Sequence, residues 1–183
     1  MKVIKYPSKE KWAEILRRPA LNTESLFDTV RGIIDRVRTE GDKAVIEYEA
    51  TFDKAELTSL AVTNEELEEG VALVSEELKA AISLAKQNIE RFHAAQKFVG
   101  KKVETMPGVT CWQKAVGIEK VGLYIPGGTA PLFSTVLMLA VPAKIAGCKD
   151  IILCTPPDSK GKIHPAILFA ARLAGADRIF KAG

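Results

Sequence analysis

The chain has 183 residues, 47% of them hydrophobic, and a net charge of +3. The hydrophobic fraction supports a packed core and excludes a disordered chain, while the modest charge, without lysine and arginine clusters interleaved with aromatics, argues against a nucleic-acid partner. No uninterrupted apolar segment is long enough to span a bilayer and Met1–Lys11 is too polar for a signal peptide, so we expect no membrane partner.

The first hundred residues have the periodicity of a helical layer. Apolar residues recur every three or four positions, and serine, threonine or aspartate stands where helices would begin. Thr63 and Glu66 have the spacing of a capping box. The longest helix begins at Ser75, and its apolar rhythm to Gln96 predicts one buried face. We expect the other helices over Glu10–Arg17, from Asn22 or Thr23 to Glu40, from Asp42 through Phe52, and after Thr63.

Strand-like alternation begins after residue 100. Lys102–Thr105 and Val109–Gly117 alternate apolar and polar residues, and Met106-Pro107-Gly108 between them predicts a hairpin turn. We place a domain boundary between Gly117 and Val121. This gives a helical N-terminal region with a hairpin over residues 1–120 and a second domain over residues 121–183.

The second domain begins with a βαβ pattern. Val121–Ile125 is an apolar run typical of a buried strand, and proline and glycine then break it. Ser134 or Thr135 is positioned to cap a helix over Val136–Ile145, which is apolar almost all round and therefore interior. A second buried strand follows over Asp150–Cys154. A crossover of this kind makes the two strands parallel.

One further helix and strand complete the pattern. Ile163–Leu173 is a helical stretch that Gly175 closes, and Arg178–Lys181 is a short third strand. The fold class is α/β: a helical layer and hairpin, followed by an incomplete Rossmann-like parallel βαβαβ unit. Ligands of such sheets bind beyond the carboxyl ends of the strands.

That edge contains the candidate binding residues. The loop Pro126-Gly127-Gly128 follows the first parallel strand, either as a backbone-lined ligand loop or as a simple chain reversal. Spacing alone favours the reversal, because the chain lacks G-x-G-x-x-G and G-x-x-x-x-G-K-[ST]. Tyr124 is the best single candidate. A tyrosine in a buried strand usually packs its ring or anchors its hydroxyl, and the residue alone favours that interpretation, but a ring at the mouth of the sheet can also stack on a flat heterocycle or hydrogen-bond a ribose.

The cysteines and histidines offer little reactive chemistry. Cys111, Cys148 and Cys154 lack C-x-x-C spacing, and the last two lie too far apart along one strand for a disulfide, so we expect reduced thiols in a cytoplasmic protein. His93 and His164 have no partner at motif spacing and are interpreted as structural or solvated. We therefore assign no catalytic and no metal-binding residue.

Several unusual segments occur in the order found in a known family. AKQNIERFHAAQ, YIPGGTAPLFSTVLM, PAKIAGC and CTPP closely resemble histidinol dehydrogenase, whose members are substantially longer, so the chain is similar to their N-terminal part. The resemblance implies an NAD- and zinc-dependent oxidoreductase of histidine biosynthesis that oxidises L-histidinol to L-histidine through the aldehyde. It also implies a homodimer at full length.

The resemblance also implies roles for particular residues. Tyr124 matches the tyrosine of the family motif that contacts the dinucleotide, and Pro126, Gly127 and Pro157 match the walls of that loop. The family's zinc ligands and catalytic Glu-His pair would lie after Gly183. We therefore expect the 183 residues alone to be catalytically silent and to bind no specific zinc.

Two other functions remain open from the residues. One is a relative of the aldehyde or acyl-phosphate reductases, which would require a catalytic cysteine in a loop. The other is a small α/β binding or scaffolding module that is complete as it stands.

Overall fold

The computed structural model describes residues 3–18, 24–128 and 130–183. The chain divides into two compact units, Met1–Glu40 and Gly41–Gly183, which are described separately. The domain boundary expected between Gly117 and Val121 stays a prediction.

The first unit is helical. It contains η1 (Lys9–Lys11), α1 (Trp12–Ile15) and α2 (Glu24–Glu40). The expected helix over Glu10–Arg17 is shorter than predicted, because its last turn tightens and the Arg17 N–H donates to Glu14 O rather than continuing the α-helical ladder. The predicted start of α2 at Asn22 or Thr23 lies outside the described residues. Leu26 and Val30, two of the apolar residues that recur at helical spacing in α2, are exposed.

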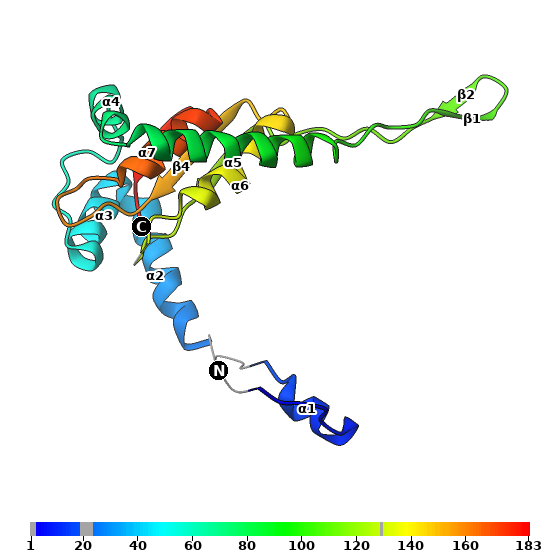
Figure 1. The fold of residues 1–183 in the computed structure, drawn as a ribbon. Helices are drawn as coiled ribbons and strands as arrows, with labels where there is room; N and C mark the ends of the chain where they lie inside the picture. The colour runs from blue at the N-terminus through cyan, green and yellow to red at the C-terminus, as the bar shows by residue number, and fades with distance from the viewer. Residues whose placement is uncertain (1–2, 19–23, 129) are drawn as a thin grey trace. The chain divides into compact units, whose positions relative to one another are not determined.

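The second unit combines five α-helices, a hairpin and a three-stranded sheet among the described residues. Figure 1 shows α5 beside α6, which it contacts. The elements in chain order are α3 (Asp42–Tyr48), the π-helical turn η2 (Glu49–Asp53), α4 (Asn64–Ala72), α5 (Glu76–Ala94), β1 (Val103–Met106), β2 (Val109–Cys111), β3 (Lys120–Tyr124), α6 (Phe133–Ile145), β4 (Asp150–Thr155), α7 (Pro165–Ala174) and β5 (Arg178–Lys181).

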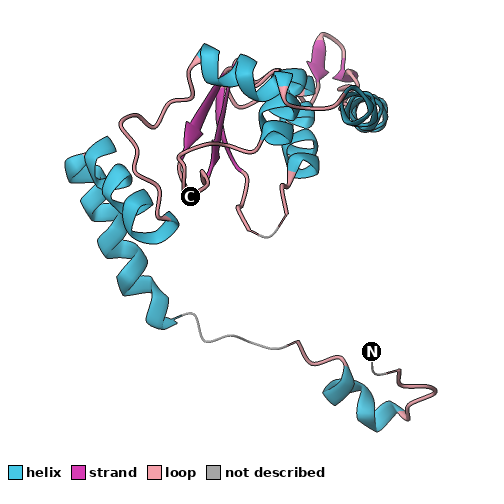
Figure 2. Cartoon of the chain, turned by 60° about the vertical axis from the view of Figure 1, so that its left-hand side comes forward, coloured by secondary structure: helices cyan, strands magenta, loops and turns pink. Residues whose placement is uncertain are grey.

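The sheet has the strand order β3-β4-β5, and both pairs are parallel, which confirms the predicted architecture (Figure 2). Tyr124 lies opposite Cys154, and Thr155 lies opposite Lys181. Residues 60–62 run antiparallel along the outer edge of β5, where the Lys181 N–H donates to Leu60 O at 2.7 Å. All three strands therefore end at one carboxyl edge.

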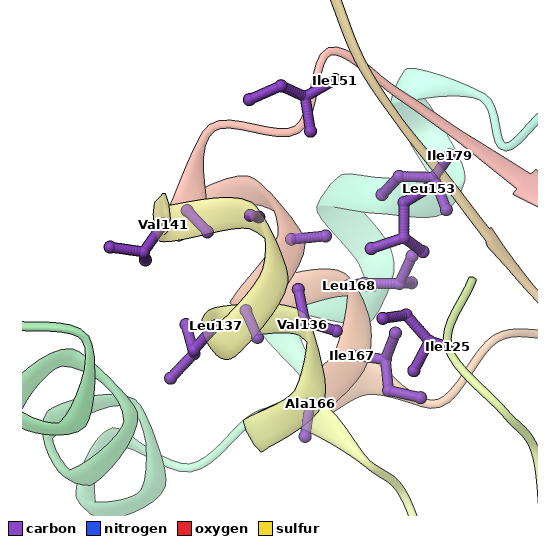
Figure 3. Close-up of a cluster of buried hydrophobic side chains, with 14 of the residues drawn as sticks. Ile125, Val136, Leu137, Val141, Ile151, Leu153, Ala166, Ile167, Leu168 and Ile179 are labelled. Carbon is purple, nitrogen blue, oxygen red and sulfur yellow. The ribbon is translucent and has the colours of Figure 1, made fainter. Parts of the chain in front are cut away.

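The core lies between one face of this sheet and the helices α6 and α7. The strand residues Ile151 and Leu153 are completely buried, and so is Val136 on α6 (Figure 3). Ala170 on α7 is completely buried too. The prediction that α6 is an interior helix holds for its core-facing side alone, because Met138 and Leu139 on α6 are 52% and 38% exposed. The packing orders β3, β4 and β5 and so defines the edge where the loops meet.

Two helix caps match the sequence and one does not. Thr63 and Glu66 form both hydrogen bonds of the capping box, and Ser75 caps α5, as predicted. The prediction of Ser134 or Thr135 as the cap of α6 is wrong, because the helix begins at Phe133 with Leu132 as its N-cap. Leu132 and Phe133 pack against the core, and this packing of the first turn outweighs the preference for a polar cap.

Two exposed features differ from the prediction. Along α5 only Ile82 is fully buried and Phe92 is 66% exposed, so the buried face is shorter than expected. The hairpin forms around Gly108, which has φ of 80°, but its second strand ends at Cys111 rather than Gly117. A register shift between Glu104 and Met106 disrupts the ladder, and these exposed strands pair with no other strand in the described part of the chain.

Candidate ligand-binding site at the carboxyl edge of the sheet

A pocket of about 860 Å³ lies where β3, β4 and β5 end. Its walls come from the loops after these strands, from α4 and from the start of α7. Parallel sheets bind ligands at this edge, because the loops there diverge and expose backbone groups.

All four residues proposed from the sequence line this pocket: Tyr124, Pro126, Gly127 and Pro157. Tyr124 ends β3 with 53% of its surface exposed, so its ring is available to a ligand. The location at a cleft is thus as predicted, while the cofactor contacts stay a prediction.

Gly127 lies against the next loop of the edge. A Cβ placed on Gly127 would come within 2.4 Å of Pro156 Cγ, closer than atoms in real structures approach. The ring of Pro156 cannot move far without its backbone. The loop after β3 can therefore lie against the loop after β4 only with glycine here.

A part-buried ion pair forms one wall. Lys181, only 7% exposed at the end of β5, donates to Glu66 Oε1 on α4 at 2.6 Å, and Lys162 approaches the same oxygen at 3.4 Å. Burial raises the pKa of Glu66, but the hydrogen bonds from Lys181, from the Thr63 N–H and from Lys162 outweigh it, so the pKa lies below its usual value. This pair ties α4 to the sheet.

The loop after β4 is organised by Asp158. Its Oδ1 accepts the N–H groups of Lys160 and Lys162, each at 2.9 Å. Gly161 turns the chain with φ of 71°. The carboxylates of Asp158 and Glu66, which line this wall, therefore already accept hydrogen bonds from within the protein.

The sequence reasoning missed Thr155, which lines the same pocket. Thr155 is 1% exposed, and its Oγ1 has no hydrogen-bond partner among the described residues. The predicted strand ended at Cys154, one residue early, so Thr155 was left in the terminating loop. The alternation of buried Ile151 and Leu153 continues to Thr155 and was the available signal.

A buried carboxyl lies beside the end of β5. Glu49 on η2 is 3% exposed; its Oε1 accepts the Gly183 N–H at 2.7 Å, and its Oε2 has no partner among the described residues. Burial raises the pKa of Glu49, the Gly183 N–H opposes this, and the neighbouring Asp53 carboxylate raises it further. Asp53 and Gly183 line the pocket.

The histidines lie apart from each other. His164 Nδ1 accepts the Ala166 N–H at 3.2 Å and so caps α7, and His93 packs edge-on against Phe92. In the described ranges, no three His, Cys, Asp or Glu side chains are grouped as metal ligands.

The cysteines are free: Cys111 is exposed, Cys148 is buried and Cys154 is half-buried. Burial raises the pKa of the Cys154 thiol, the one nearest to the carboxyl edge, which is the opposite of what activates a nucleophilic cysteine. This disfavours the reductase alternative. No helix in the described part of the chain combines the length and the apolarity needed to cross a bilayer.

Comparison with known proteins decides the family. The family model described as histidinol dehydrogenase matches residues 16–183. The chain belongs to the histidinol dehydrogenase family.

Individual histidinol dehydrogenases are similar throughout the chain. The enzyme of Bacteroides thetaiotaomicron is 77% identical over 183 residues, and that of Salmonella typhimurium is 51% identical over 177 residues, or 96% of this chain. A crystal structure of histidinol dehydrogenase from Elizabethkingia anophelis matches 97% of the chain with a TM-score of 0.92 and 50% identity. The chain spans 43%, 40% and 41% of these three proteins, respectively.

Proposed function

We propose that the pocket binds the NAD dinucleotide, and that the chain supplies the cofactor side of an NAD- and zinc-dependent oxidation of L-histidinol to L-histidine. The observation that carries the proposal is Tyr124, half-exposed at the end of β3 in a pocket of about 860 Å³. A pocket of this size accommodates a dinucleotide. Bound NAD would supply the hydride acceptor.

The residues present fit the dinucleotide in three respects. The Tyr124 ring offers a stacking surface, Pro126 and Gly127 form a wall that exposes backbone, and Thr155 offers a buried hydroxyl. Carboxylates in the lining also suit ribose hydroxyl groups, which donate hydrogen bonds.

Zinc does not fit the described part of the chain in the same way. A zinc site needs three or more converging nitrogen, oxygen or sulfur ligands, and the described side chains form no such group. We therefore assign no residue of this chain to zinc. The homodimer and the cytoplasmic location stay predictions.

Calorimetric titration of NAD tests the proposal. Tyr124→Ala is expected to weaken NAD binding by about 5- to 150-fold, because stacking on a base contributes about 1–3 kcal/mol. Tyr6→Ala is the matched control, because Tyr6 is fully exposed and outside the pocket. Equal NAD affinity for wild type and Tyr124→Ala would reduce Tyr124 to a packing residue.

A further inference from the structure

The hydroxyl of Thr155 is a buried polar group without a hydrogen-bond partner among the described residues. Thr155 ends β4, the central strand, and lies opposite Lys181 on β5. Thr155 is only 1% exposed, yet it lines the pocket. No described residue donates to or accepts from Oγ1.

A buried hydroxyl without a partner is unfavourable compared with a methyl group of the same shape. Valine has nearly the shape of threonine and is common in strands, so local structure does not require the hydroxyl. The main-chain role of the residue is separate, because Thr155 O accepts the Ala182 N–H at 3.0 Å. The hydroxyl itself therefore performs no structural task among the described residues.

Two charged groups that line the same pocket are already engaged. Lys181 Nζ donates to Glu66 Oε1 at 2.6 Å, and Asp158 Oδ1 accepts two backbone N–H groups. Carboxylates outnumber lysines in the lining: Asp53, Glu66, Glu69 and Asp158 against Lys162 and Lys181. An anionic ligand group beside Thr155 would be repelled by these carboxylates, whereas an uncharged group would not be.

We propose that Thr155 Oγ1 is a ligand contact that hydrogen-bonds a ribose hydroxyl of the bound dinucleotide. This inference rests on the proposed function and deepens it. A threonine hydroxyl both donates and accepts, as a ribose hydroxyl does, so the two groups satisfy each other. Tyr124 and Thr155 then contact the dinucleotide from neighbouring strands of the same edge.

Thr155→Val separates a ligand contact from a structural role. For the 183-residue chain, the melting temperature without ligand is expected to stay equal or rise, while the Kd for NAD by calorimetry rises about tenfold. Thr155→Ser keeps the hydroxyl and is expected to retain most of the affinity. Thr110→Val is the matched control, because Thr110 is exposed on β2, and it leaves both readouts unchanged.

Mononucleotides identify the contacted group. AMP and nicotinamide mononucleotide each contain one ribose, and the one whose affinity falls in Thr155→Val holds the contact. A loss of affinity for inorganic phosphate instead would overturn the ribose assignment.

The outcomes also distinguish this inference from the proposed function. If Tyr124→Ala weakens NAD binding and Thr155→Val does not, the Thr155 contact is refuted and the proposed function stands. If wild type does not bind NAD, both are refuted. A Thr155→Val chain that melts several degrees lower would show a structural role and contradict the inference.

Discussion

Gly183 donates its backbone N–H to Glu49 Oε1 over 2.7 Å, so the second residue after β5 is attached to η2, 134 positions earlier in the chain. Ala182 donates to Thr155 O in the same segment. The end of the third strand is therefore held both by the sheet and by a buried carboxyl. This attachment determines part of the pocket wall.

The raised pKa of Glu49 predicts how stability depends on pH. A carboxyl with a pKa higher in the folded state binds more protons when folded, so its contribution is complete below about pH 4.3, the ordinary glutamate value, and is lost as pH rises through the folded pKa. Glu49→Gln keeps an oxygen that accepts the Gly183 N–H and removes the buried charge. We expect the variant to be about 1 kcal/mol more stable at pH 7 and equal to wild type near pH 4, by urea unfolding.

Glu49→Ala is the complementary variant, because it removes the acceptor as well and should lower stability at both pH values. The same pH dependence in wild type and Glu49→Gln would show that Glu49 is not the titrating group.

The pKa shift of Glu66 has the opposite sign to that of Glu49, so its effect on stability has the opposite dependence on pH. Its lowered pKa means that its contribution is present above about pH 4.3 and is lost as pH falls through the folded pKa. Glu66→Gln keeps the capping box, since glutamine serves there too, but removes the charge that faces buried Lys181. We expect a loss of about 1.5–3 kcal/mol at pH 7, by urea unfolding.

Glu68→Gln is the matched control for this change. Glu68 is on the same helix and pairs with Arg172, but both side chains are largely exposed, so the loss should stay below about 1 kcal/mol. Equal losses for the two variants would contradict a special role for the Glu66–Lys181 pair.

Gly127 is expected to tolerate no side chain. The Cβ of Gly127→Ala would meet Pro156 Cγ at 2.4 Å, so the loops after β3 and β4 must separate. We expect NAD affinity to fall at least tenfold, by calorimetry, if these loops bind the dinucleotide. Gly122→Ala is the control within β3, because a Cβ there has no atom within 4 Å. If Gly127→Ala binds NAD as tightly as wild type, the contact between Gly127 and Pro156 does not contribute to NAD binding.

The 183-residue chain is expected to show no histidinol oxidation. The described residues offer no zinc donor set, and hydride transfer requires substrate to be positioned against the cofactor. The assay supplies histidinol, NAD and zinc and follows NADH absorbance, with zinc measured after dialysis. Turnover at the rate of a full-length histidinol dehydrogenase, or one tightly bound zinc per chain, would contradict this expectation.

Much of the fold and part of the site could be predicted from local pattern. Short apolar runs separated by helical stretches were enough to predict three parallel strands, because crossovers of that length leave no other pairing. The proline-glycine break that follows Ile125 was enough to place the Tyr124 ring at the edge of the sheet. Thr155 was missed because the predicted strand was one residue too short, which placed its side chain in the loop and not in the buried alternation of β4.

The sequence by itself determined the helix periods, the capping box at Thr63, the parallel βαβαβ order and the position of Tyr124, since each depends on residues close together in the chain. Only the tertiary structure decided that Lys181 meets Glu66, 115 positions away, and that Glu49 holds Gly183. No local pattern encodes such pairs, because they arise when packing of α4, η2 and the sheet excludes water from groups that must then satisfy one another.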